Sequence, residues 1–67
     1  MAGIIGIVKF ENLKKLIERA KADPSFREED AEVFINCNDD LAITWCNEHG
    51  YCGYFLNFKT GEVIYGD

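Results

Sequence analysis

The stretch from residue 41 to residue 58, LAITWCNEHGYCGYFLNF, decides the fold. Apolar side chains alternate with small or polar ones on both sides of the polar segment 47–50. Aromatic and β-branched residues are enriched, as is typical of strands. A short turn makes its two flanking strands antiparallel neighbours. We therefore predict a β-hairpin with strands at 41–46 and 51–58.

The register of this hairpin follows from apolar side chains that meet across the two strands. A shift by one residue would set Trp45 against Gly53 and would turn every side chain of one strand to the other face of the sheet. The register that keeps apolar neighbours together pairs Leu41 with Leu56, Ile43 with Tyr54, Trp45 with Cys52, and Cys46 with Tyr51.

The rest of the chain adds a helix and further strands. Residues 11–22 place apolar side chains at the i, i+3, i+4, i+7 spacing of one buried helical stripe. Period-two patterns with intervening turn residues predict strands at 31–37 and 62–65, with a three-residue turn at 59–61. Residues 3–9 read as a further short strand, at an edge or in the middle. We predict a single α+β domain over residues 1–67, with one amphipathic helix packed on a four- to five-stranded, mainly antiparallel sheet.

The two faces of the predicted sheet differ in their cover. The helix is expected to cover one face, which carries Val33, Ile35, Cys37, Leu41, Ile43, Trp45, Cys52, Tyr54, Leu56, Phe58 and Ile64. The other face carries Phe34, Thr44, Cys46, Tyr51, Phe55, Val63 and Tyr65. Uncovered aromatic residues mark a partner surface, a dimer interface or a face covered by the strand at 3–9.

Three cysteines and one histidine raise the alternative of a metal site. A Cys3His set is a known zinc ligand set. In the predicted register, however, Cys46 and Cys52 point to opposite faces and cannot share a metal ion or a disulfide. The acidic surroundings also disfavour a catalytic thiolate. We favour a plain hairpin with His49 exposed in its turn, and the alternative is a metal site built from Cys37, Cys46, His49 and Cys52.

Charge is distributed unevenly along the chain. Residues 1–27 carry a net charge of +3, whereas residues 28–67 carry nine acids and one lysine, a net charge of −8. An acidic domain is repelled by nucleic acid, whose binding needs cations, and is attracted to basic protein surfaces. We predict a partner-binding surface made of the acids and the uncovered aromatic residues: Glu28, Glu29, Asp30, Glu32, Asp39, Asp40, Glu48, Phe34, Tyr51, Phe55 and Tyr65.

The acidic run EEDAE at 28–32, together with Asp39-Asp40 on a small α+β domain, resembles the small acidic anti-CRISPR proteins that phages encode against host defence. The resemblance lies in size, charge and architecture over the whole chain. It implies a cytoplasmic, non-enzymatic inhibitor that mimics nucleic acid on a basic groove of a host nuclease complex and does not itself bind nucleic acid.

The remaining sequence features are consistent with this interpretation. The apolar run at 3–8 is too short to span a bilayer and lacks the flanks of a signal peptide. An odd number of cysteines with no export signal predicts a reducing cytoplasm. We find no catalytic or cofactor motif and predict neither enzyme activity nor a cofactor. There are two alternatives. The first is a structural or regulatory homodimer that uses the aromatic face, and the second is a small metal-binding protein with Cys and His ligands.

Overall fold

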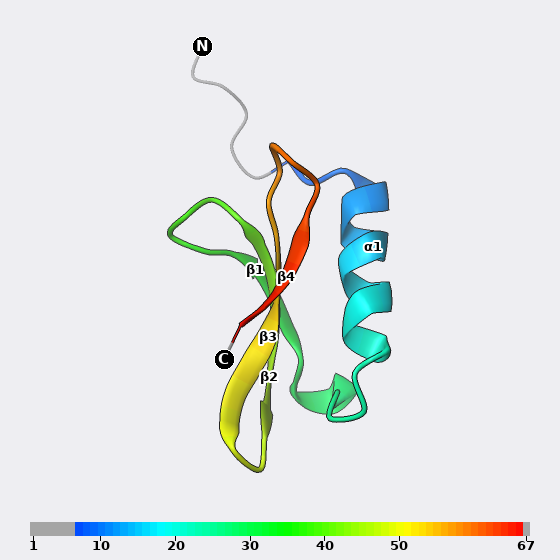
Figure 1. The fold of residues 1–67 in the computed structure, drawn as a ribbon, viewed down its shortest axis with the longest axis vertical. Helices are drawn as coiled ribbons and strands as arrows, with labels where there is room; N and C mark the ends of the chain where they lie inside the picture. The colour runs from blue at the N-terminus through cyan, green and yellow to red at the C-terminus, as the bar shows by residue number, and fades with distance from the viewer. Residues whose placement is uncertain (1–6, 67) are drawn as a thin grey trace.

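The computed structural model describes residues 7–66, which form one helix followed by a four-stranded antiparallel sheet (Figure 1). The strands neighbour one another in chain order, so the sheet is a simple meander. The predicted α+β fold is confirmed. The elements are helix α1 (Phe10–Lys21), the short 3-10 helix η1 (Glu28–Asp30) and strands β1 (Glu32–Ile35), β2 (Leu41–Asn47), β3 (Gly50–Leu56) and β4 (Val63–Gly66).

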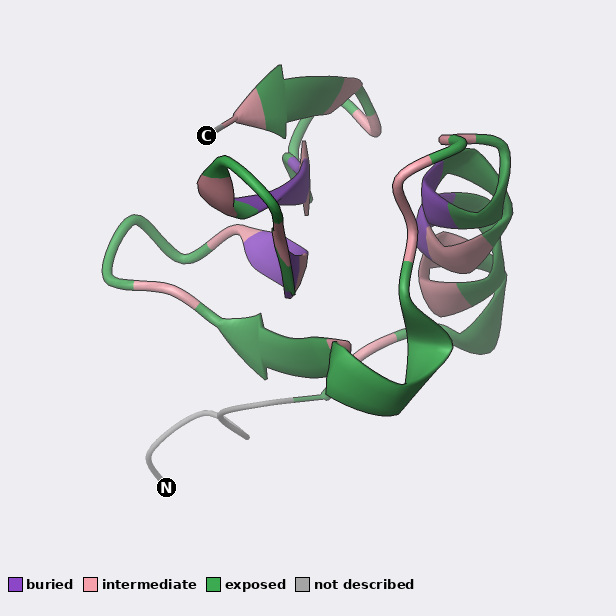
Figure 2. Cartoon of the chain, turned by 90° about the horizontal axis from the view of Figure 1, so that it is seen from below, coloured by how far each residue is buried: buried purple, intermediate pink, exposed green. Residues whose placement is uncertain are grey.

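Helix α1 packs along one face of the sheet with the predicted apolar stripe. Leu16 and Ala20 are fully buried, and Leu13 and Ile17 pack partly buried against the same core. Burial is concentrated on the side of α1 that faces β2 and β3 (Figure 2). The helix ends before Pro24, as expected, because proline disfavours helical geometry at the residue before it.

The β2–β3 hairpin adopts the predicted register over its whole length. Trp45 pairs with Cys52, Ile43 with Tyr54, and Leu41 with Leu56. These side chains point toward the helix, and Trp45 is fully buried there. The Trp45 ring meets the edge of Phe26 at a centroid distance of 5.1 Å and stacks on Tyr54 at 5.9 Å.

Each hairpin turn begins with an asparagine whose side chain organises the turn. The Oδ1 atom of Asn36 accepts the N–H of Asn38, that of Asn47 accepts the N–H of His49, and that of Asn57 accepts the N–H of Lys59, at 2.9, 2.7 and 2.8 Å. This bond from a side chain to the backbone two residues later is the Asx turn. The three asparagines therefore fix where each strand stops.

The asparagine at position 57 explains why the predicted position of β4 was wrong. We expected a three-residue turn at 59–61, but the loop comprises residues 58–61 and is closed by the bond from Asn57 N–H to the Glu62 carbonyl at 2.9 Å. The extra loop residue shifts the pairing by one position and reverses the faces of β4. Val63 and Tyr65 therefore lie on the helix side, opposite Leu56 and Tyr54, and Ile64 lies on the other face, opposite Phe55.

Strand β1 is shorter and less covered than predicted. It ends at Ile35, so Cys37 lies exposed in the β1–β2 loop, not in the core. Val33 and Ile35 lie on the sheet face that was predicted to be covered by the helix, but they remain 46% and 38% exposed. The prediction also placed Phe58 in the core, but it lies in the β3–β4 loop and is 37% exposed.

The predicted strand at 3–9 falls only partly on described residues. Residues 7–9 belong to no helix or strand, and residues 3–6 lie outside the described part of the chain.

Candidate protein-binding surface

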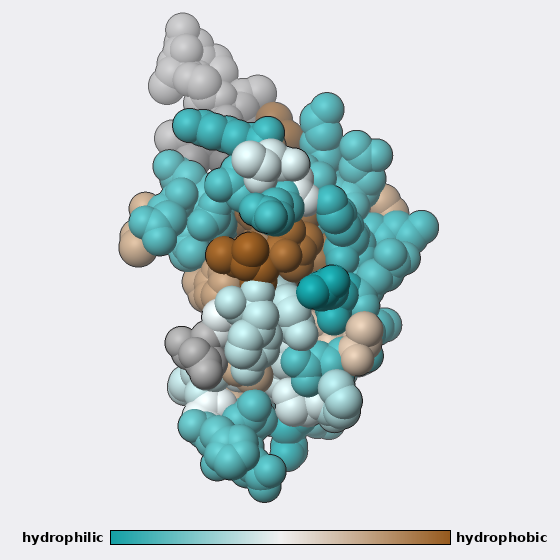
Figure 3. Space-filling view, in the orientation of Figure 1, coloured by the Kyte–Doolittle hydropathy of each residue, from teal (hydrophilic) through white to brown (hydrophobic). Residues whose placement is uncertain are grey.

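The face of the sheet opposite α1 has no covering element among residues 7–66 (Figure 2). On it, Phe34 is 43% exposed, Tyr51 73% and Ile64 55%. Figure 3 views the sheet from its β4 edge, with α1 at the right, and shows apolar surface over β4 between hydrophilic side chains. We call the sheet face opposite α1 the open face. The residues that strand pairing places on it are Glu32, Phe34, Ala42, Thr44, Cys46, Tyr51, Gly53, Phe55, Ile64 and Gly66, of which Ala42 and Gly53 are buried.

Phe55 anchors the open face by lying over the C-terminal glycine of β4. A β-carbon placed on Gly66 would come within 2.5 Å of the Phe55 ring. The glycine therefore makes room for the aromatic ring, and the ring in turn covers exposed strand backbone. Next to this contact, a shallow apolar hollow of about 150 Å³ is lined by Thr44, Tyr51, Cys52, Phe55 and Gly66.

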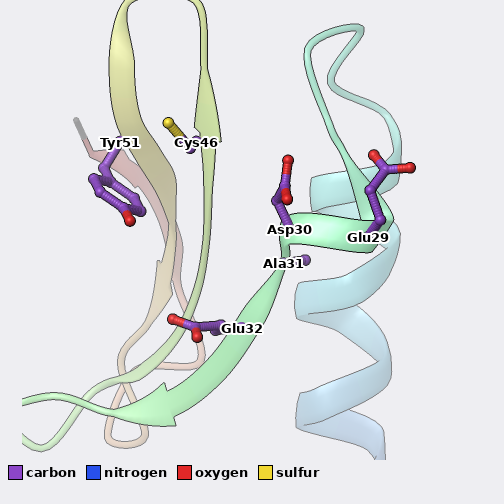
Figure 4. A pocket seen from close by; sticks show the side chains of 6 residues that line it. All are labelled: Glu29, Asp30, Ala31, Glu32, Cys46 and Tyr51. Carbon is purple, nitrogen blue, oxygen red and sulfur yellow. The ribbon is translucent and has the colours of Figure 1, made fainter.

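An acidic groove adjoins the open face where η1 approaches the β2–β3 hairpin. It has a volume of about 570 Å³ and is lined by Glu29, Asp30, Ala31, Glu32, Cys46 and Tyr51. Figure 4 shows Glu32 extending from β1 toward the hairpin, whereas Asp30 stands at the end of η1 and is separated from Glu32 by Ala31. Tyr51 and Cys46 form the opposite wall (Figure 4). The fold thus places three of the four acids of the run at 28–32 in one groove with the Tyr51 side chain.

Arg27 neutralises part of this negative charge. Its Nε atom lies 3.0 Å from an Asp30 carboxylate oxygen and 3.6 Å from a Glu29 oxygen. All three side chains are about half exposed or more, so these ion pairs contribute little to stability. Among residues 7–66 no ion pair engages Glu28 or Glu32. Glu32 therefore gives the groove most of its uncompensated charge, whereas Glu28 lies outside the groove and lines a hollow on the helix side of the sheet.

The other predicted binding acids occupy separate positions. Asp39 and Asp40 lie in the β1–β2 loop, at the opposite end of β1 from η1, and Asp39 adopts the left-handed conformation with a φ of 63°. Glu48 lies in the β2–β3 turn, where it pairs with His49 at 3.7 Å. The acids thus stand at both ends of β1 and at the hairpin tip, not in one continuous array.

The predicted face is confirmed for three of the four aromatic residues and is wrong for the one on β4. Phe34, Tyr51 and Phe55 belong to the open face, but Tyr65 lies on the helix side. There its ring meets Tyr54 at a centroid distance of 5.3 Å, and it stays 51% exposed at the edge of the core. Ile64 takes the place on the open face that was predicted for Tyr65.

The cysteines and the histidine do not come together. Cys37 lies in the β1–β2 loop and Cys46 on the open face, while Cys52 is buried on the helix side. The His49 side chain is 86% exposed in the turn. No group of three or more potential metal ligands is found among residues 7–66.

A polar network that the sequence analysis did not identify joins the α1–η1 connection to the sheet. The Asp23 carboxylate accepts hydrogen bonds from the N–H and the hydroxyl of Ser25 and from the Tyr54 hydroxyl, each at 2.9 Å. The Ser25 hydroxyl in turn accepts the Trp45 Nε1–H at 3.3 Å. Each donor stabilises the charged carboxylate, so the bond from the Ser25 N–H, followed by those of the two hydroxyls, lowers the pKa of Asp23.

The pKa of Tyr54, by contrast, is raised. Burial of its phenol is the main cause, and the hydrogen bond to Asp23 is the second. Arg19 lies over the Tyr54 ring, with its guanidinium carbon 5.7 Å from the ring centroid. The Asp23 network faces the core and serves to fix the helix on the sheet. The only available sequence signal for it was Asp23-Pro24-Ser25 itself, a typical turn sequence.

Comparison with known proteins assigns no relative to this chain. No protein-family model matches the sequence, and searches among curated proteins and solved structures find no significant match. Within residues 7–66 no helix has the length and apolar character needed to cross a membrane. Function must therefore be inferred from the surface itself.

Proposed function

We propose that this protein is a non-enzymatic, cytoplasmic inhibitor. It would dock on a basic groove of a host nuclease complex of the CRISPR type, where nucleic acid normally binds. The observation that carries the proposal is the acidic groove, in which Glu32 and Asp30 adjoin Tyr51. Carboxylates would occupy positions on the partner that normally hold phosphates. The open face would supply apolar contact area.

The distribution of charge supports this mode of binding. Complementary charge raises association rates and excludes wrong partners, whereas affinity comes mainly from buried aromatic and apolar anchors. Here the acids stand at both ends of β1 and at the hairpin tip, at the margin of an open face on which Phe34, Tyr51 and Ile64 are exposed. The basic side chains of α1 lie on the other side of the sheet, so they would not oppose docking of a basic partner.

A displacement experiment tests the proposal. The immobilised protein would be incubated with cell lysate, and bound proteins would be eluted with a short DNA or RNA duplex and identified by mass spectrometry. We expect nucleic-acid-binding proteins that are released by the duplex and by high salt. A charge-reversed variant of the groove, Asp30→Lys with Glu32→Lys, should lose them.

The matched control reverses two charges on the helix, Lys14→Glu with Lys15→Glu, and should retain the partner. The proposal would be wrong if neither the duplex nor the charge reversal at Asp30 and Glu32 released the captured proteins.

A homodimer is the second candidate, and exposure of Phe34 and Ile64 favours it. A symmetric contact through the open face would bury both side chains against their copies. Sedimentation equilibrium decides between the two: Ile64→Lys should dissociate such a dimer, and a monomer at every concentration would remove this candidate.

A further inference from the structure

Strand β1 is an unpaired edge of the sheet within the described residues. It pairs with β2 on one side, and no strand among residues 7–66 pairs with it on the other. Its apolar residues Val33, Phe34 and Ile35 are 46%, 43% and 38% exposed. An edge of this kind is a template for pairing with another extended chain.

The turn at the end of β1 shows which of its backbone groups face outward. The Asn36 N–H donates to the Asp40 carbonyl at 3.0 Å, which makes these two residues a hydrogen-bonded pair. In an antiparallel ladder, hydrogen-bonded and non-hydrogen-bonded pairs alternate. Phe34 therefore bonds to β2, and the N–H and C=O groups of Val33 and Ile35 point away from the sheet. Four backbone groups are thus arranged to receive an added strand.

The two sides of β1 offer different surroundings to the side chains of such a strand. On the open face lies the acidic groove, with Glu32 in its wall. On the helix side lies a hollow of about 300 Å³ whose lining is mainly apolar, with Ile17, Phe26 and Val33 among it, and also includes the oppositely charged Lys21 and Glu28. Successive side chains of a strand point to opposite faces. An added strand would therefore direct one set of side chains toward the carboxylates of the groove and the other toward a mainly apolar hollow.

Charge at the two ends of β1 argues against a second copy as the occupant. Antiparallel self-pairing centred on Phe34 would bring η1 of one copy toward Asp39 and Asp40 of the other, at both ends of the contact. Like charges placed together in this way oppose association. The same acids would attract a segment rich in lysine or arginine.

We propose that β1 binds an extended segment of a partner protein in which basic and apolar side chains alternate, by adding it as a fifth strand to the sheet. The basic side chains lie toward the acidic groove, and the apolar ones enter the hollow beside Val33. Backbone hydrogen bonds to Val33 and Ile35 hold the segment in place, as in other cases of strand addition. The proposal rests on the function proposed above and specifies how the basic partner is bound.

The test uses the full-length protein labelled with ¹⁵N and a seven-residue peptide of alternating lysine and valine. At a peptide concentration of about ten times the dissociation constant, amide exchange at Val33 and Ile35 should slow roughly tenfold, because exchange then requires release of the peptide. The amides of β4, the other edge of the sheet, are the internal control and should keep their rates. A peptide of alternating glutamate and valine should not bind.

Two methylated peptides separate strand addition from simple charge attraction. One carries N-methyl groups on every valine and the other on every lysine, so charge and composition are the same. Only one of these two sets of amides can face β1. We expect one peptide to bind like the parent and the other to bind at least about tenfold more weakly, because each lost backbone hydrogen bond weakens binding severalfold.

Three results would overturn the proposal. If both methylated peptides bound like the parent, attraction by the acids alone would explain binding, and the proposed function would survive without strand addition. If no peptide bound, the edge would have no such ligand, whatever the outcome of the duplex displacement. If Val33 and Ile35 became protected with rising protein concentration and no peptide, the edge would belong to a second copy.

Discussion

The two faces of the sheet are made from the same strands, but one is buried under the helix and the other is largely exposed. On the helix side, Trp45 and Leu56 are fully buried and Tyr54 is tied by its hydroxyl to Asp23. On the open face, Phe34, Tyr51 and Ile64 remain exposed and acids gather at the margin. Most of the buried core lies on the helix side, although Ala42 is fully buried on the open face, and most of the open face remains accessible. Substitutions on the two faces should therefore have separable effects.

The largest effect on folding is expected from the neighbouring pair Leu56 and Ile64. Leu56→Ala removes a fully buried side chain from the helix side and should lower the free energy of unfolding by about 2–5 kcal/mol. Ile64→Ala, on the open face, should cost less than about 1 kcal/mol because Ile64 is already 55% exposed. Urea denaturation followed by circular dichroism measures both. Equal losses would contradict the separation of the two faces.

A smaller effect is expected where the open face has its own packing. Gly66→Ala places a methyl group against the Phe55 ring and should destabilise the protein by about 1–3 kcal/mol. Phe55→Leu should relieve part of this cost in the double variant, because it removes the clashing ring. A double-mutant cycle by urea denaturation measures the coupling. Additive effects would mean that Phe55 and Gly66 do not depend on each other.

The Asp23 network predicts a dependence of stability on pH. The folded pKa of Asp23 lies below its usual value of 3.8, so its contribution is present above that pH and is lost as the pH falls through the folded pKa. Asp23→Asn should cost about 1 kcal/mol at neutral pH and should flatten stability curves measured below about pH 4. Thermal unfolding from pH 7 to pH 2 tests this. An unchanged acid slope would contradict the assignment to Asp23.

Tyr54 provides the complementary test at alkaline pH. Its pKa is raised from 10.0, so its contribution is present below that pH and is lost as the pH rises through the folded pKa. Tyr54→Phe should therefore cost about 1 kcal/mol at neutral pH and should remove part of the alkaline loss. If the variant and the parent lost stability in parallel above pH 10, Tyr54 would not be responsible.

The smallest effect on folding is expected in the acidic groove. Glu32→Gln and Arg27→Gln should each change the free energy of unfolding by no more than about 0.5 kcal/mol, because both side chains lie at the surface. Their effects on a basic partner should be opposite: Glu32→Gln weakens binding, whereas Arg27→Gln frees Asp30 and Glu29 and strengthens it. Calorimetric titration with the alternating lysine–valine peptide measures this. Changes of the same sign in both variants would contradict charge-driven binding.

The sequence by itself determined the helix, the meander and the register of the central hairpin. Alternation of apolar side chains in residues 41–56 permits one pairing that keeps Trp45 and Leu41 among apolar neighbours, and the structure adopts it. The apolar stripe on α1 was equally informative, because side chains spaced at the helical period lie on one face of the helix and thereby identify the buried face. In both cases a strong local pattern and the requirement to bury apolar surface favour the same arrangement.

The tertiary structure alone decided the edges of the sheet and the site built on them. A single additional loop residue after Asn57 exchanged the faces of Ile64 and Tyr65, because strand pairing has a period of two. Residues 28–30 form a short helix that folds back toward β2, and this places Glu29 and Asp30 in the same groove as Tyr51. Segments such as these have no strong apolar periodicity. Their conformation depends on contacts with residues far away in the sequence, which the local sequence does not predict.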